Sequence, residues 1–304
     1  MTRSRLVAVL WLLVTAPAHG GSTQEQTPPA LLANPGGLQL LAVTAAAEPT
    51  LRVVLPGRPT SDRSIEVRVP EHVTAVRRGS MAAEQLFLPG PNSAGGAVAW
   101  RAAGRAIEYE RDLPGPVHLL ARATLEDDGV RFRYELTSRS STAYDMITAV
   151  TDPRLTGIFH DVRLERTYVH HADGFDLIAS DVPGRLTLPL DRWLPARVLA
   201  SFTWPVALQR VEQRGDGITY YHKARAVDVP LLVTRSTDSE WLVASFAHAP
   251  GNVWSNPELT CQHVDPQAPL LPRQRVVLEV KMLVMRGSLD DALRLAIRQR
   301  AAMK

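Results

Sequence analysis

Two alternating segments around a tight turn constrain the fold of this chain more than any other feature. In residues 117–126 and again in residues 130–137, apolar side chains occupy almost every second position. A period of two is the pattern of a β-strand with one buried face. Asp127-Asp128-Gly129 separates the two segments, and an Asp-Gly pair is a strong signal for a two-residue hairpin turn. We therefore predict an antiparallel hairpin here and a fold built from β-sheets.

The rest of the chain repeats this pattern in shorter pieces. A second hairpin is predicted where residues 206–213 and 218–223 flank Arg214-Gly215-Asp216-Gly217. Further strands are expected at residues 51–55, 64–69, 97–100, 162–169, 229–234, 241–247 and 275–285. The 23 prolines are scattered among these segments, and proline interrupts helices but is tolerated at strand ends. The pattern predicts an all-β fold, a sandwich of antiparallel sheets.

One helix is predicted, over residues 288–302 at the end of the chain. Ser288 and Asp291 have the spacing of an N-terminal capping box. Apolar residues then recur at helical spacing: Leu289, Ala292, Leu293, Ala296 and Ile297. We expect a short amphipathic helix docked on the sandwich, and the alternative is a helix that binds a membrane or a partner helix.

The first 18 residues have the three parts of a secretory signal peptide. Arg3 and Arg5 form a basic start, residues 6–14 are apolar, and Ala16-Pro17-Ala18 is typical of a cleavage site. The apolar run is shorter than the roughly 20 residues that span a bilayer. We expect a secreted or periplasmic protein without a transmembrane segment in the mature chain, and the alternative is a retained N-terminal anchor. Residues 19–37 are predicted to be a flexible lead-in, and residues 38–304 a single β-sandwich domain.

Charge and cysteine content exclude several classes of protein. Loss of Arg3 and Arg5 with the signal peptide leaves 32 basic and 31 acidic residues, and no block of basic residues occurs. Nucleic-acid binding needs a clustered basic face, so no nucleic-acid partner is expected. Cys261 is the only cysteine, and it cannot form a disulfide within the chain. We interpret it as a small buried residue rather than a nucleophile.

The segment 252–266 is the strongest candidate for a functional site. It holds Asn252, Trp254, Asn256, Cys261, His263 and Asp265 between two predicted strands. A tryptophan ring covers the apolar face of a sugar, while amides and carboxylates bind its hydroxyl groups. His263 and Asp265 lie two residues apart, which allows the carboxylate to orient the imidazole. These residues predict a saccharide site, and a purely structural loop is the alternative.

Other histidines and tyrosines supply candidates for proton transfer. His170 follows the predicted strand 162–169, and Tyr221 and His222 end the second hairpin. We predict His263, His222, His170 and Tyr221 as the catalytic candidates. For substrate binding we predict Trp254, Asn252, Asn256 and Asp265, with Arg166 reaching the site if the ligand is acidic. The sequence contains no H-E-x-x-H and no paired C-x-x-C, so no metal ion or cofactor is expected.

The run of strands from residue 38 to residue 285 resembles the galactose-mutarotase-like supersandwich. The late segment with Cys261, His263 and Asp265 before a last long strand adds to the resemblance. This family includes aldose epimerases, polysaccharide lyases and accessory domains of glycoside hydrolases. The resemblance implies an antiparallel β-supersandwich, and its epimerases and lyases use histidine, glutamate, tyrosine or arginine. No motif of one subfamily can be placed on this chain, so no catalytic residue is carried over.

These observations predict a secreted, monomeric carbohydrate-handling protein that binds a saccharide, with epimerase-like or lyase-like chemistry as a further step. A non-catalytic interaction domain of the cell envelope is the first alternative. The second is a metal-dependent hydrolase, which requires at least three ligands to converge among His170, His171, His222, His263, Asp173 and Asp265. The position of these side chains in space decides among the three.

Overall fold

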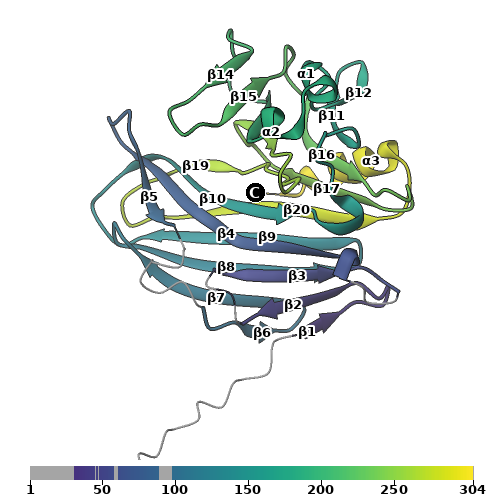
Figure 1. Ribbon diagram of the computed structural model, residues 1–304. Helices are drawn as coiled ribbons and strands as arrows, with labels where there is room; N and C mark the ends of the chain where they lie inside the picture. Colours follow the sequence, from purple (N-terminus) through teal and green to yellow (C-terminus); the bar gives the residue numbers. More distant parts are fainter. Residues whose placement is uncertain (1–30, 45, 47, 58–60, 89–97, 304) are drawn as a thin grey trace, which may run out of the picture.

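The computed structural model describes residues 31–44, 46, 48–57, 61–88 and 98–303, and in this part of the chain the strands form three sheets (Figure 1). The predicted signal peptide and most of the predicted lead-in lie outside the described residues. The pairing is antiparallel with one exception, the parallel pair β13 and β15. The predicted all-β class and the single long helix at the end are confirmed.

A seven-stranded sheet forms one layer of the sandwich. Its order is β1-β2-β3-β4-β10-β19, and β5 also pairs with β4. The strands are β1 (Leu31–Ala33), β2 (Gln39–Val43), β3 (Thr50–Val54), β4 (Ser64–Arg77), β5 (Ala83–Phe87), β10 (Tyr144–Arg154) and β19 (Gln267–Leu270). β1 lies within the predicted lead-in, residues 19–37, and pairs with β2.

A nine-stranded sheet forms the second layer. Its order is β12-β11-β16-β17-β20-β9-β8-β7-β6. The strands are β6 (Arg101–Ala103), β7 (Ala106–Leu113), β8 (Val117–Glu126), β9 (Gly129–Ser138), β11 (Thr167–His171), β12 (Gly174–Leu177), β16 (Val229–Arg235), β17 (Leu242–Ala247) and β20 (Arg275–Met285).

The core lies between these two sheets because their strands alternate. Val117, Leu119, Ala121, Ala123 and Leu125 of β8 are buried, and the residues between them are partly exposed. In β9 the buried side chains include Tyr134, whose hydroxyl lies 2.7 Å from Thr151 Oγ1 of β10 in the facing sheet. A hydrogen bond therefore links the two layers through the apolar core.

A smaller four-stranded sheet carries the rest of the strands. It runs in the order β14 (Val211–Gln213), β15 (Thr219–His222), β13 (Ala196–Ser201) and β18 (Asn252–Ser255). Short helical turns connect the sheets: η1 (Ser61–Arg63), η2 (Gly157–Phe159), α1 (Gly184–Thr187) and α2 (Leu190–Trp193). Figure 1 shows β14 and β15 near α1 and α2, away from β6, β7 and β8.

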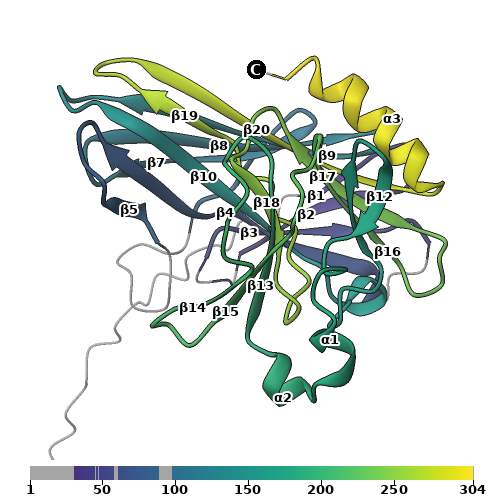
Figure 2. The same cartoon turned by 90° about the horizontal axis from the view of Figure 1, so that it is seen from above.

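The C-terminal helix α3 (Leu289–Arg300) lies along β16 and β17 (Figure 2). Its capping box is the predicted one, with the Ser288 side chain and the Asp291 side chain bonded reciprocally to the backbone. Ala292 and Ala296 are buried against the sheet, whereas Ile297 is 53% exposed. No helix of the described residues is long and apolar enough to cross a membrane.

The first hairpin differs from its prediction in one detail. Glu126 pairs with Gly129, so the two turn residues are Asp127 and Asp128. Gly129 serves a different purpose, since a Cβ at this residue would lie 2.0 Å from the carbonyl oxygen of Met282 in β20. The glycine allows two backbones to approach closely.

The predicted strand 162–169 is shorter than expected. Only β11, from Thr167, is extended, and Leu164 adopts a positive φ of 51°. The carboxylate of Asp161 accepts hydrogen bonds from the backbone N–H groups of Glu165 and Arg166 at 3.0 and 2.7 Å. An aspartate that bonds the following backbone stabilises a turn in place of a strand.

Candidate functional site

The outer face of the four-stranded sheet brings aromatic and polar side chains into one row. Leu199 of β13 lies opposite His222 of β15 on one side and opposite Trp254 of β18 on the other. Arg197 is paired in the same way with Tyr220. Neighbours in register point to the same face of a sheet, so these five side chains share one surface.

A hollow of about 300 Å³ lies on this face, and we call it the groove. Its lining residues are Arg197, Leu199, Trp204, Arg214, Tyr220, Asn252 and Trp254. The guanidinium of Arg214 stacks over Tyr220 at 3.8 Å, and that of Arg197 lies 5.8 Å from the Trp254 ring. Aromatic faces beside hydrogen-bonding side chains are typical of a small-molecule site.

Trp204 separates the groove from a second hollow. The second hollow measures about 430 Å³ and is lined by Asp145, Met146, Trp204, Gln267, Ala268 and Pro269. Trp204 is 49% exposed, so its ring is available to both hollows. The two hollows together form a longer surface with an indole ring between them.

Gly251 fixes the position of this ring. Its carbonyl oxygen accepts hydrogen bonds from the backbone N–H groups of Phe202, Thr203 and Trp204, each at 3.0 Å. A Cβ on Gly251 would lie 2.2 Å from the indole of Trp204. The indole therefore packs directly against the backbone, which only glycine permits.

Trp254 connects the groove to a buried group beside it. Its ring stacks on the imidazole of His263 with centroids 3.7 Å apart and planes 3° apart. The two residues also form an isolated β-bridge through reciprocal backbone hydrogen bonds of 3.0 Å. Trp254 is therefore held by both its backbone and its ring, and a rigid ring is a good platform for a ligand.

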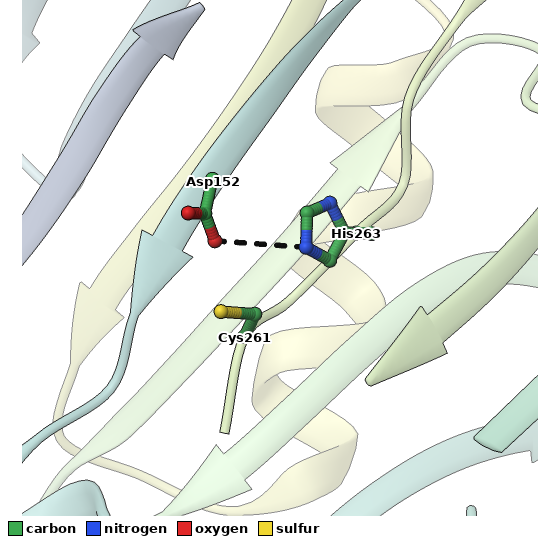
Figure 3. A group of neighbouring side chains, drawn as sticks. All are labelled: Asp152, Cys261 and His263. Carbon is green, nitrogen blue, oxygen red and sulfur yellow. Dashed lines mark ion pairs between the residues drawn. The ribbon is translucent and has the colours of Figure 1, made fainter. Parts of the chain in front are cut away.

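Next to Trp254, three side chains form a buried group that we call the Asp-Cys-His cluster. Asp152 comes from β10, and Cys261 and His263 come from the loop after β18 (Figure 3). One ligand-type atom of each residue lies within 4.8 Å of the other two. Each residue is 1% exposed. Asp152 Oδ1 and His263 Nε2 are 3.6 Å apart.

Two further groups orient this cluster. His263 Nδ1 lies 3.3 Å from Asp265 Oδ2, and the other oxygen of Asp265 accepts the Thr151 N–H at 2.9 Å. On the opposite side, Arg154 Nε donates to Asp152 Oδ2 at 2.6 Å. The predicted orientation of His263 by Asp265 is therefore present in the structure.

The charges in the cluster shift one another's protonation. Burial opposes a charged His263, but the hydrogen bond to Asp265 and the charges of Asp265, Asp152 and Glu71 outweigh it and raise its pKa. Burial also opposes a charged Asp152, but the charges of His263 and Arg154 lower its pKa. Burial, aided by the charge of Asp152, raises the pKa of the Cys261 thiol well above its ordinary value. A buried thiol with a raised pKa is a poor nucleophile.

The other predicted site residues lie elsewhere. Tyr221 points to the inner face, where its ring lies 5.3 Å from Trp193, so Tyr220 takes the predicted place on the groove. Asn256 Oδ1 accepts the backbone N–H groups of Leu259 and Cys261, which gives it a structural role in its loop.

His170 and Arg166 also lie apart from the groove lining. His170 belongs to β11, with Nδ1 2.7 Å from Asp228 Oδ1. Arg166 donates to the backbone carbonyls of Ile158, His160 and Arg235, so its guanidinium closes a turn. His222 and His263 are both on the face that carries Trp254, and His263 is buried there. His170 lies on another sheet.

Sequence reasoning missed several residues of this region. Arg197, Trp204, Arg214 and Tyr220 line the groove, and Asp152 completes the buried cluster. The alternation of residues 196–201 marks Arg197 as a side chain on the outer face of a strand. No local signal marks Asp152, because its partners come from a distant loop.

No protein-family model matches the chain, and no curated protein matches its sequence. Solved structures do match its fold. The Slr1438 protein from Synechocystis sp. PCC 6803 superposes with a TM-score of 0.49 and 10% identity, over 91% of this chain and 100% of that one. The GalM/aldose epimerase homologue from C. elegans has a TM-score of 0.46 and 13% identity, over 86% and 100% of the two chains. Galactose 1-epimerase from Lactobacillus acidophilus NCFM has a TM-score of 0.42 and 11% identity, over 86% and 95%.

The solved structures that superpose on the chain include aldose epimerase homologues, all with TM-scores below 0.5. The identities are too low to transfer an activity or a site residue, because one fold hosts many functions. The groove is therefore interpreted from its own side chains.

Proposed function

We propose that this protein binds a neutral oligosaccharide in the groove on its four-stranded sheet. The observation that carries the proposal is the set of aromatic rings Trp204, Tyr220 and Trp254 around one hollow. Such rings cover the apolar faces of sugar rings. Asn252 supplies an amide for hydroxyl groups in the same hollow.

A neutral ligand fits the charges of the groove. Arg197 Nη1 lies 3.1 Å from Glu258 Oε1, and Arg214 Nε lies 3.0 Å from Glu212 Oε1. Both guanidiniums of the groove lining are therefore compensated by a carboxylate. An acidic sugar would have to compete with those carboxylates, so uronic acids gain little over neutral sugars.

An oligosaccharide fits the length of the surface better than a single sugar. The second hollow continues on the far side of Trp204. A chain of sugar units can extend from the groove along the exposed part of the indole into the second hollow.

The direct test is calorimetric titration of the purified protein with neutral and uronic-acid oligosaccharides. Trp204→Ala should weaken binding of a neutral oligosaccharide by about 1–3 kcal/mol, as for the loss of one aromatic anchor. Leu208→Ala is the matched control, since Leu208 is fully exposed at 100% and lines neither hollow. Absence of binding to every neutral sugar would favour the predicted cell-envelope interaction domain.

Turnover of the bound sugar is a second candidate function, and His222 favours it. His222 Nε2 lies 3.6 Å from Glu212 Oε2 on the face that carries the groove. An imidazole next to a carboxylate can transfer a proton to or from a sugar. His222→Gln should abolish turnover and preserve affinity if the protein is an enzyme. A wild-type protein that binds a sugar and leaves it unchanged would contradict this second function.

We further propose that the protein acts outside the cytoplasm, because residues 1–18 have the pattern of a signal peptide. N-terminal sequencing of the protein recovered from periplasm or medium should begin near His19. A mature chain that retains Met1 would contradict this proposal.

A further inference from the structure

We propose that the Asp-Cys-His cluster is a binding site for a divalent transition-metal ion of the zinc type. Asp152 Oδ1, Cys261 Sγ and His263 Nε2 are the three ligand atoms. Carboxylate, thiolate and imidazole are the ligands that zinc prefers in proteins. The site differs from the groove because its three residues are buried beside Trp254 and do not line the groove.

The spacing of the ligand atoms fits such an ion. Asp152 Oδ1 and His263 Nε2 are 3.6 Å apart, which is too long for a hydrogen bond. Two ligands at zinc distances of about 2.0–2.3 Å in tetrahedral geometry lie roughly 3.3–3.8 Å from each other. The separation therefore fits two ligands of one ion, and the 4.8 Å limit on the three atoms requires only a small contraction.

The Asp152 carboxylate has one oxygen available. Oδ2 accepts the hydrogen bond from Arg154, whereas Oδ1 is buried and has no hydrogen-bond partner. This oxygen faces the His263 imidazole at 3.6 Å and the Cys261 thiol. A metal ion between the three atoms would give this buried oxygen a closer partner.

His263 has the arrangement of a metal-binding histidine. One ring nitrogen is held by the carboxylate of Asp265, and the other faces Asp152 and Cys261. Histidines that bind metals usually donate their second N–H to a carboxylate, which fixes the ring and raises its basicity. The Thr151 N–H in turn fixes Asp265, and the stacked Trp254 fixes the plane of the imidazole.

Binding of the ion releases protons, because cysteine binds a metal as the thiolate and histidine as the neutral imidazole. Bonds form from the metal to Cys261 Sγ and to His263 Nε2, and the protons held on these atoms leave to solvent.

The three ligands come from two segments that lie far apart in the sequence. The ion would join β10 to the loop after β18, and that loop holds the Trp254 ring that lines the groove.

Cobalt(II) titration of the chelator-treated full chain tests the proposal. One Co²⁺ per chain should produce thiolate-to-cobalt charge-transfer absorption, and an excess of Zn²⁺ should remove it. Cys261 is the only cysteine of the chain, so this absorption identifies its sulfur as a ligand in the wild-type protein itself. A folded wild-type protein that takes up no Co²⁺, or takes it up without this absorption, overturns the proposal.

Variants locate the other ligands. Asp152→Asn and His263→Gln should each weaken Co²⁺ binding more than Asp265→Asn, for which a loss of about 10–100-fold is expected from an outer carboxylate. His118→Gln is the matched control, because His118 is also paired with carboxylates but lies on β8. Equal affinity of wild type and Asp152→Asn would rule out Asp152 as a ligand and overturn the site as proposed.

Discussion

Two buried clusters of charge in this protein differ in how completely their atoms are paired. In the first, which we call the lysine cluster, Lys281 is fully buried and its ammonium donates to Glu126 and Asp128 at 2.6 Å each. The remaining oxygens of those carboxylates accept from Arg131 and Gln299. In the Asp-Cys-His cluster, one oxygen of Asp152 has no hydrogen-bond partner.

The difference separates a structural cluster from a candidate site. Every carboxylate oxygen of the lysine cluster has a protein donor, so nothing remains for a ligand to bind. The Asp-Cys-His cluster has three ligand atoms facing one point and an unused oxygen among them. Burial and charge alone therefore do not identify a site; three ligand-type atoms within 4.8 Å of one another mark the Asp-Cys-His cluster as a candidate.

The largest expected effect is on the lysine cluster. Lys281→Met removes the buried cation and leaves the carboxylates of Glu126 and Asp128 close together. We expect the free energy of unfolding to fall by about 3 kcal/mol, measured by urea denaturation. Arg52→Met, which removes an exposed pair with Glu66, is the control and should cost less than about 1 kcal/mol. A loss of similar size in both variants would mean that pairing inside the protein is no stronger than on its surface.

Zinc should separate the two clusters directly. At a free Zn²⁺ concentration 100 times the dissociation constant, wild type should gain about 2.7 kcal/mol of stability. Lys281→Met should gain the same amount, whereas Asp152→Asn should gain much less. The readout is the urea midpoint with and without Zn²⁺. An equal gain in all three proteins would place the bound zinc outside the Asp-Cys-His cluster.

Replacement of the thiol tests how tightly Cys261 is enclosed. Cys261→Ser places a hydroxyl where a buried thiol stood, and we expect a loss of about 1 kcal/mol in the metal-free protein. Native wild-type protein should react slowly with a thiol reagent, because Cys261 is 1% exposed. Labelling as fast as in urea would contradict this burial.

The smallest expected loss of stability is the one that low pH causes in the lysine cluster. Burial opposes the charged forms of Glu126 and Asp128, but their bonds to Lys281 and neighbouring donors outweigh it and lower both pKa values below the ordinary 4.5 and 3.8. Carboxyls with lowered pKa values stabilise the fold above their unfolded values, and that stability is lost as the pH falls through the folded values.

Because both carboxylates are partly exposed, we expect this contribution to be less than about 1 kcal/mol. Urea midpoints between about pH 5 and pH 3 should fall less steeply for Lys281→Met than for wild type. Parallel curves for the two proteins would show that Lys281 does not lower these pKa values.

Local patterns predicted the sheets and the helix well. The alternation in residues 130–137 and the cap at Ser288 act within a few residues, and both are present as predicted. The strand predicted at 162–169 was too long because the Asp161 carboxylate accepts hydrogen bonds from the following backbone. The alternation of apolar and polar residues does not show that bond.

The candidate site was predicted only in part, since it depends on pairings between distant segments. Trp254 and Asn252 were recognised because a tryptophan and amides stand together in the sequence. Tyr220 and Arg197 join them through the parallel pairing of β13 with β15, for which no local signal exists. The burial of His263 also depends on a pairing that no local signal shows, its β-bridge to Trp254.

Gly251 gives the groove a form of specificity that does not depend on any polar contact. The indole of Trp204 rests where a side chain on residue 251 would otherwise stand. Any larger residue at position 251 would push the indole of Trp204 outward. The sizes of the two hollows that this ring separates would then change. In the proposed function, the length and bend of the sugar chain would thus be set by the missing methyl group of a residue that need not touch the sugar. Relatives with the same polar side chains could therefore differ in ligand through this one backbone position.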